Sequence, residues 1–207
     1  AGFSATRGKE ETLFKIVMGQ VRPDVEKSWS KTLSADGSNA VRVGFVDVSH
    51  LAGLDPEMTL AQVITELPLE MTYTHDTVAR VTAVSPTVAA TASRDWAGFS
   101  TTRGKEISTF KLVMGQVRPD QEQTWSKTNA VDNSEGVRVG FTDAAGLAGL
   151  DPLSPLAAVL GMAPAVMLYA HDGVARITAA STSTAAGANI DAFGFSTTRT
   201  KDESIFK

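Results

Sequence analysis

The feature that most constrains this fold is an internal repeat. A nine-residue segment, Gly-Phe-Ser-Thr-Thr-Arg-Gly-Lys-Glu at residues 98–106, has close copies at residues 2–10 and 194–202. The three copies begin at residues 2, 98 and 194, so their spacing is 96 residues both times. More than half of the positions at this offset carry the same residue, without insertion or deletion. Such periodicity indicates duplication of one structural unit, which must be the starting point for any fold prediction.

The repeat predicts a division of the chain into similar modules. A unit of this length can bury about 60–65% of its unfolded surface without a metal or a disulfide. The segments that separate the modules are rich in Ala, Ser and Thr, which favours linkers. The sequence stops where the earlier copies begin an apolar run, which suggests a processed product or a window of a longer array. We therefore expect a first module at 1–84, a linker at 85–97, a second module at 98–180, a linker at 181–193, and the start of a third copy at 194–207.

Alternating apolar residues predict most of each module to be β-structure. Phe14, Ile16 and Met18 share one face at a period of two, and Arg22-Pro23-Asp24 is expected to end that strand because proline presets a turn. Short strands are expected around 29–32 and 41–45, joined by a loop of turn-forming residues. A closing hairpin is expected over 69–84, with its turn at the His-Asp pair that both copies contain.

One helix is expected in each module. Asp55 and Pro56 resemble a helix N-cap followed by proline at the first helical position. Leu60, Val63 and Ile64 then follow at helical spacing. The predicted fold class is therefore α+β and mostly β, with two tandem copies of a module of about five strands and one helix, plus a partial third copy that is strand-like.

Composition excludes several classes of function. The net charge of −4 argues against a nucleic-acid partner, which normally meets a basic face. No apolar run approaches the roughly 20 residues of a membrane span. The absence of cysteine removes disulfides, thiol nucleophiles and thiolate metal sites. The glycines around Lys105 do not have phosphate-loop spacing. We assign no catalytic residue, cofactor or metal, and leave open a weak calcium site in the loops at 36–39 and 132–135.

The repeat-start segments are the predicted interface. We expect their phenylalanines to anchor joints between modules or subunits and their arginines to lie at the rim. The tail is expected to dock as a strand, either on its own chain or on another molecule, because strand sequence without its own module exposes backbone hydrogen-bonding groups. The predicted interface residues are Phe3, Arg7, Phe99, Arg103, Phe195, Arg199 and Phe206.

Two functions remain after these exclusions. The first is a non-enzymatic structural protein (filament, surface stalk or scaffold linker) whose partners are other copies of itself or repeated protein partners. The alternative is a tandem carbohydrate-binding module with Trp29 and Trp125 as glycan platforms. An enzyme ranks last, because the only repeated titratable pair lies at a turn. The charge favours an extracellular or cell-surface setting over an intracellular or organellar scaffold.

Overall fold

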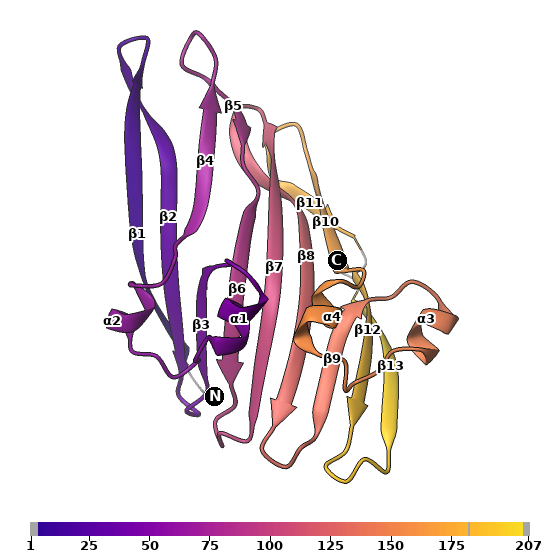
Figure 1. Ribbon diagram of the computed structural model, residues 1–207. Coiled ribbons are helices and arrows are strands. Elements are labelled where there is room, and N and C mark those ends of the chain that lie inside the picture. The colour runs from indigo at the N-terminus through magenta and orange to yellow at the C-terminus, as the bar shows by residue number, and fades with distance from the viewer. Residues whose placement is uncertain (1–3, 182, 205–207) are drawn as a thin grey trace.

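Long antiparallel strands dominate the fold. The computed structural model describes residues 4–181 and 183–204, and this part of the chain contains thirteen strands and four short helices (Figure 1). The strands are β1 (Ser4–Val17), β2 (Gln20–Ser34), β3 (Asn39–Gly44), β4 (Leu69–His75), β5 (Val81–Val84), β6 (Thr87–Arg94), β7 (Ser100–Val113), β8 (Gln116–Ala130), β9 (Glu135–Gly140), β10 (Ala165–His171), β11 (Ile177–Ala180), β12 (Ser183–Ile190) and β13 (Thr197–Ser204). The helices are α1 (Val48–Gly53), α2 (Leu60–Val63), α3 (Ala144–Ala148) and α4 (Leu156–Leu160). The prediction of a β-rich chain is confirmed.

The strands form one 13-stranded sheet rather than separate bodies. Its central order is β13-β12-β9-β8-β7-β6-β3-β2, with β1 on the outer edge of β2. The other edge of β2 is shared, since β3 pairs with residues 30–33 and β4 with residues 25–28. β8 is shared in the same way by β9 and β10. Hydrogen-bonded pairing therefore continues without a break from the first 96 residues into the second.

The first hairpin differs from its prediction. The chain turns at Met18 and Gly19, whose φ angles of 50° and 76° are both in the left-handed region that a two-residue hairpin turn needs. β2 then runs through Pro23, which was expected to end a strand. A bulge between Leu13 and Phe14 places Phe14 opposite Pro23, and a bulge is one of the few places where a strand tolerates proline. β7 and β8 repeat this register at an offset of 96.

The helical segment also differs from its prediction. Two short helices replace the single expected one: the Asp47 carboxylate caps α1, and Thr59 caps α2 in a capping box with Gln62. Asp55 lies in the turn between them, where its Oδ1 accepts a hydrogen bond from the Glu57 N–H. Each 96-residue stretch thus contains six strands and two helices, not five strands and one helix.

The segments expected to be linkers contain central strands. β6 lies within 85–97 and pairs with β3 on one side and β7 on the other. β12 lies within 181–193 and pairs with β9 and β13. Ala90 and Ala92 are fully buried and Ala89 is 1% exposed. Small residues make a composition typical of a linker, but here they allow a strand to pack closely beneath the helical segments.

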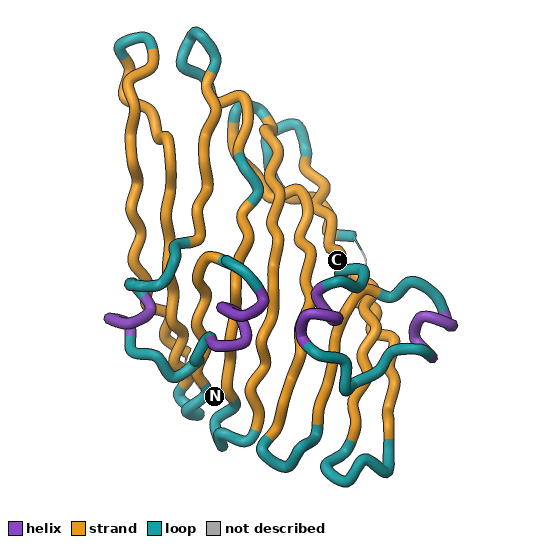
Figure 2. The backbone as a smooth tube through the Cα atoms, in the orientation of Figure 1, coloured by secondary structure: helices purple, strands orange, loops and turns teal. Residues whose placement is uncertain are grey.

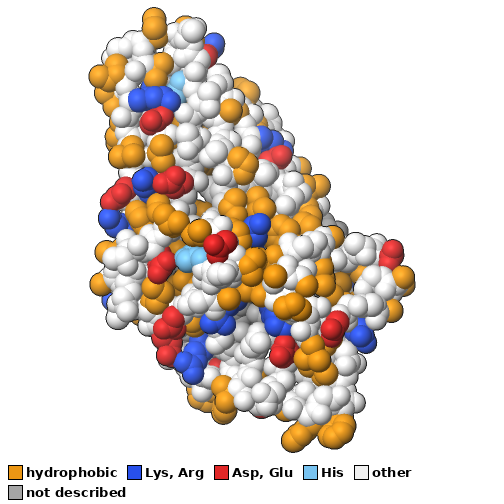
Figure 3. All heavy atoms as spheres, in the orientation of Figure 1, with side chains coloured by type: hydrophobic (Ala, Val, Ile, Leu, Met, Phe, Trp, Pro, Cys, Tyr) orange, Lys and Arg blue, Asp and Glu red, His pale blue; other side chains and the backbone are white. Residues whose placement is uncertain are grey.

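Two clusters of apolar side chains lie beneath the helices. The face of the sheet that carries Trp29 and Val41 is covered by the segments around α1 and α2, and we call it the helix face (Figure 2). Trp125 and Val137 hold the equivalent positions in the second cluster. Leu160 of α4 packs against both clusters, so the two cores adjoin. Hydrophobic side chains also lie exposed at both ends of the molecule (Figure 3). In the part of the chain that the structure describes, no helix has the length and apolar character needed to cross a membrane.

Candidate functional site: the strands at the repeat starts

The repeat-start segments form strands that pair across the repeat boundary. β7 pairs with β8 along its whole length and with β6 over residues 101–108. β13 pairs with β12 over residues 197–204, so the tail lies on its own chain. We call the β6–β7 contact the first joint and the β12–β13 contact the second joint.

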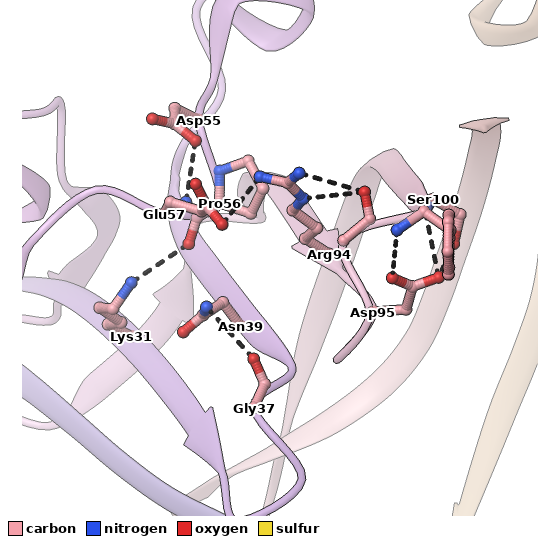
Figure 4. Close-up of polar contacts among 11 residues, drawn as sticks. Lys31, Gly37, Asn39, Asp55, Pro56, Glu57, Arg94, Asp95 and Ser100 are labelled. Atoms are coloured by element: carbon pink, nitrogen blue, oxygen red, sulfur yellow. Dashed lines mark hydrogen bonds and ion pairs between the residues drawn. The ribbon is translucent and has the colours of Figure 1, made fainter. Parts of the chain in front are cut away.

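A short turn connects β6 to β7. Gly98 has a φ of +70°, and the Asp95 carboxylate accepts hydrogen bonds from the N–H groups of Phe99 and Ser100 (Figure 4). Hydrogen bonds from the Ser100 side chain and from these amides lower the pKa of Asp95. Arg94 donates to the Gly98 carbonyl and forms an ion pair with Glu57 at 2.8 Å. The turn is thereby attached to the loop that precedes α2.

Three contacts hold the first joint besides the backbone ladder. Arg42 of β3 forms an ion pair with Glu106 of β7 at 2.7 Å, reaching across β6. The Lys105 ammonium lies 4.7 Å from the ring centre of Phe45 and 5.4 Å from that of Trp125, so this cation contacts an aromatic ring on each side of the boundary.

The third contact is a small-residue pair. The Thr91 hydroxyl of β6 donates to the Gly104 carbonyl at 3.2 Å. A Cβ atom added at Gly104 would lie 2.8 Å from the Trp125 carbonyl oxygen and 3.0 Å from the Thr91 hydroxyl. The close approach of β8 therefore requires glycine at this position, and the threonine fills the space that the glycine leaves.

The second joint repeats part of this set. Arg138 and Asp202 take the positions of Arg42 and Glu106, at 3.7 Å. Lys201 lies 4.9 Å from the ring centre of Phe141. Arg199 donates from Nε to the Leu150 carbonyl at 3.0 Å.

β1 carries the same residues with a neighbour on one side only. Within the described residues, β2 is the only strand that pairs with β1. Lys9 lies 5.0 Å from the Trp29 ring centre and forms an ion pair with Glu11 at 2.5 Å. Residues 4–14 are all exposed. The outer edge of β1 therefore has the sequence of a joint strand without the opposing strand.

Of the predicted interface residues, Phe99, Arg103, Phe195 and Arg199 lie in or next to the strands of the two joints, but neither of these phenylalanines is buried there. Phe99 is 64% exposed in the turn before β7, and Phe195 is 89% exposed and stacks on Phe193. Arg103 is half-buried on the helix face, whereas Arg7 is exposed. The interface role of these side chains stays a prediction, and Phe3 and Phe206 lie outside the described residues.

The proposed glycan platforms are core residues. Trp29 is 6% exposed and Trp125 is 7% exposed. Each indole N–H donates at 2.7 Å to a backbone carbonyl of the helical segment, at Glu66 and Met162. Because burial leaves no free ring face for stacking on a sugar, the structure argues against the platform hypothesis.

Other polar groups cap turns or line a hollow. Asp76 and Asp172 cap the β4–β5 and β10–β11 turns, where hydrogen bonds from the backbone N–H groups of Arg80 and Arg176 lower the pKa of each carboxyl. A hollow of about 430 Å³ on the face opposite the helices is lined by carboxylates with Lys27 and Arg42 among them. Among the described residues, no group of three or more histidine or carboxylate side chains is placed to hold a metal ion.

Sequence reasoning missed the opposing strands of the joints. Arg42 was given no role in the joint, and Thr91 lay in a predicted linker. Thr87, Val88 and Thr91 are β-branched and no turn-forming residue lies between them, which favours a strand. The alanines among them are also typical of a linker, so the strand was not predicted.

Comparison of the chain with protein-family models, curated proteins and solved structures finds no match.

Proposed function

We propose that this chain is a non-enzymatic structural repeat protein that assembles by edge-to-edge strand pairing. Two tandem copies of a small module, with the start of a third, are joined by their first strands. The same strand edge would accept a strand of another polypeptide, either another copy or a repeated protein partner. A filament, a surface stalk and a scaffold linker all need such a joint.

The position of β7 carries this proposal. It lies between β6 of the preceding copy and β8 of its own, so one strand belongs to both. Its ion pair with Arg42 and its cation contact with Phe45 both cross the boundary. An unpaired strand edge is a template for a further strand, and β-strand addition is a recurring mode of protein recognition.

The chemistry of the titratable groups supports a structural role. The aspartates with lowered pKa cap turns, as Asp95 does before β7, whereas the pKa of Glu11 is lowered by a hydrogen bond from Lys9. The charged groups at the joints pair across strands, as Arg42 and Glu106 do. These groups therefore stabilise turns or the boundary between the two copies.

The test is whether the outer edge of β1 acquires a strand. We would measure amide hydrogen exchange in residues 5–12 and sedimentation of the full chain over rising concentration. Both measurements would be made on the chain alone and with a synthetic peptide of residues 86–95, the natural opposing strand of the first joint. We expect slower exchange in residues 5–12 as the chain or the peptide is added, because each new backbone hydrogen bond protects an amide.

Residues 101–108 of β7 are the internal control, since their edge is already paired and their exchange should not respond. Sedimentation separates self-association from binding of another polypeptide. If residues 5–12 exchange freely at every concentration of chain and peptide, the assembly function is overturned.

A further inference from the structure

The two joints differ in the side chains that face each other. At the first joint Thr91 opposes Gly104, whereas at the second joint Gly187 opposes Thr200. The order of the residues is exchanged but the pair is the same, one threonine against one glycine. A Cβ atom added at Gly187 would lie 2.8 Å from the Thr200 hydroxyl, so the threonine fills this space in the second joint as well.

A second pair of opposing residues also differs between the two joints, and both of its members differ together. Val88 opposes Ile107 at the first joint, and Ile107 packs against the core cluster that contains Trp125. At the second joint Thr184 opposes Glu203, which is exposed. Each joint therefore matches apolar with apolar or polar with polar at this position, as cross-strand pairs on one face of a sheet require.

β1 carries the residue of the first joint at one of these positions and the residue of the second joint at the other. Gly8 corresponds to Gly104 of the first joint, and Glu11 corresponds to Glu203 of the second. A Cβ atom at Gly8 would lie 2.5 Å from the Trp29 carbonyl oxygen, so β2 requires glycine here. The opposing strand must then supply the covering threonine. Glu11 forms an ion pair with Lys9 at 2.5 Å, and an apolar neighbour would remove water from the rest of its carboxylate without replacing those hydrogen bonds, so a polar neighbour is favoured.

Neither β6 nor β12, the opposing strands of the two joints, meets both requirements. β6 offers threonine opposite Gly8 but Val88 opposite Glu11. β12 offers Thr184 opposite Glu11 but Gly187 opposite Gly8, which would leave two facing glycines with no covering side chain. Both strands are also already paired on this edge, β6 with β7 and β12 with β13.

We propose that the outer edge of β1 selects an Ala-rich strand that places threonine opposite Gly8 and a polar residue opposite Glu11. Gly8 and Glu11 are the residues that determine this specificity. The partner is therefore a different strand from the β12 of a second copy. This inference rests on the proposed assembly function and names the kind of partner that the edge accepts.

The test uses the full chain and three synthetic peptides based on residues 86–95. The first is the natural sequence, the second carries Val88→Thr, and the third carries Val88→Thr with Thr91→Gly. NMR titration gives the dissociation constants, and hydrogen exchange in residues 5–12 verifies the docking site. We expect the Val88→Thr peptide to bind most tightly, with the other two about two- to fivefold weaker, the range of one cross-strand pair.

A substitution in the chain should reverse the preference. In Glu11→Ile, which copies Ile107, the natural peptide with Val88 should bind more tightly than Val88→Thr. Glu11→Gln is the matched control, because it removes the charge but keeps a polar side chain, and it should retain the original order. Glu11 is exposed, so neither variant disturbs the core.

Three results would overturn the inference: equal affinities for the three peptides, an order that Glu11→Ile leaves unchanged, or self-association of the chain through residues 5–12 that exceeds peptide binding. Equal binding of all peptides leaves the assembly function standing and removes only the selectivity. Absence of any binding or self-association removes both.

Discussion

β1 and β7 have nearly the same sequence and very different surroundings. Gly104 and Ser108 of β7 are buried, whereas their counterparts Gly8 and Thr12 of β1 are exposed. β1 pairs with β2 and β7 pairs with β8 in equivalent registers, so the hairpin does not cause the difference in burial. The burial of a repeat-start strand comes from the preceding copy. Substitutions at paired positions can therefore separate what a copy contributes to its own stability from what its neighbour contributes.

The largest effects should be equal in the two copies. Trp29→Ala and Trp125→Ala should each lower the free energy of unfolding by about 3–5 kcal/mol, since each removes a buried ring. Denaturant unfolding of the two variants measures this. The tryptophan emission of the native chain should also be protected from a soluble quencher at these two positions. A loss near zero at either position would show that its ring is not part of the core.

The next largest effect should separate the copies. Ile107→Glu should cost about 1–3 kcal/mol, because it places a carboxylate opposite Val88 in a half-buried site. The converse change Glu11→Ile lies on an exposed edge and should change stability by no more than about 0.5 kcal/mol. Thermal or denaturant unfolding of both variants gives the comparison. Equal costs at the two positions would mean that β6 does not pack on β7 in solution.

A smaller effect should distinguish the ion pairs of the two joints. Arg42→Ala should cost about 0.5–1 kcal/mol, because its partner Glu106 lies at 2.7 Å and both side chains are partly shielded. Arg138→Ala should cost less, since Asp202 lies at 3.7 Å and is half exposed. The difference should shrink in high salt, which screens exposed charges. Unfolding at low and high salt measures it, and a larger loss for Arg138→Ala would contradict the order.

The sequence predicted the β-rich class because alternation is a local property, visible in Phe14, Ile16 and Met18. It also placed the closing hairpin at 69–84, where β4 and β5 lie. It could not place β6, because alanine has no strong strand preference and its role depends on what packs above it. Pro23 was misassigned for a similar reason, since the bulge that accommodates it is set by the opposing strand.

The candidate site was only partly predictable. The repeat spacing drew attention to Arg103 and to the segment around it, and that segment is the strand that crosses the boundary. The residues that oppose this segment are distant in sequence, since Arg42 lies 64 positions before its partner Glu106 and Thr91 lies 13 positions before Gly104. Which of them it meets depends on the sheet order, and no local pattern specifies that order.

The two tyrosines give a comparison that leaves stability at neutral pH unchanged. Burial, followed by a hydrogen bond to Glu26, raises the pKa of Tyr73 to about 12, and burial with a hydrogen bond to Glu122 raises the pKa of Tyr169 to about 12. A raised pKa means that the folded chain favours the neutral phenol. The resulting stabilisation is complete below pH 10 and is lost as the pH rises from about 10 to about 12.

Because the chain contains 2 tyrosines, absorbance titration of phenolate formation resolves them directly. We expect one coincident transition near pH 12 while circular dichroism still reports folded sheet, and half its amplitude in either Tyr73→Phe or Tyr169→Phe. The coincidence matters more than the value, since it compares equivalent positions in the two copies. If Tyr73 ionised well below Tyr169 in the folded chain, the difference between the copies would extend beyond the edge of β1 into the body of the sheet.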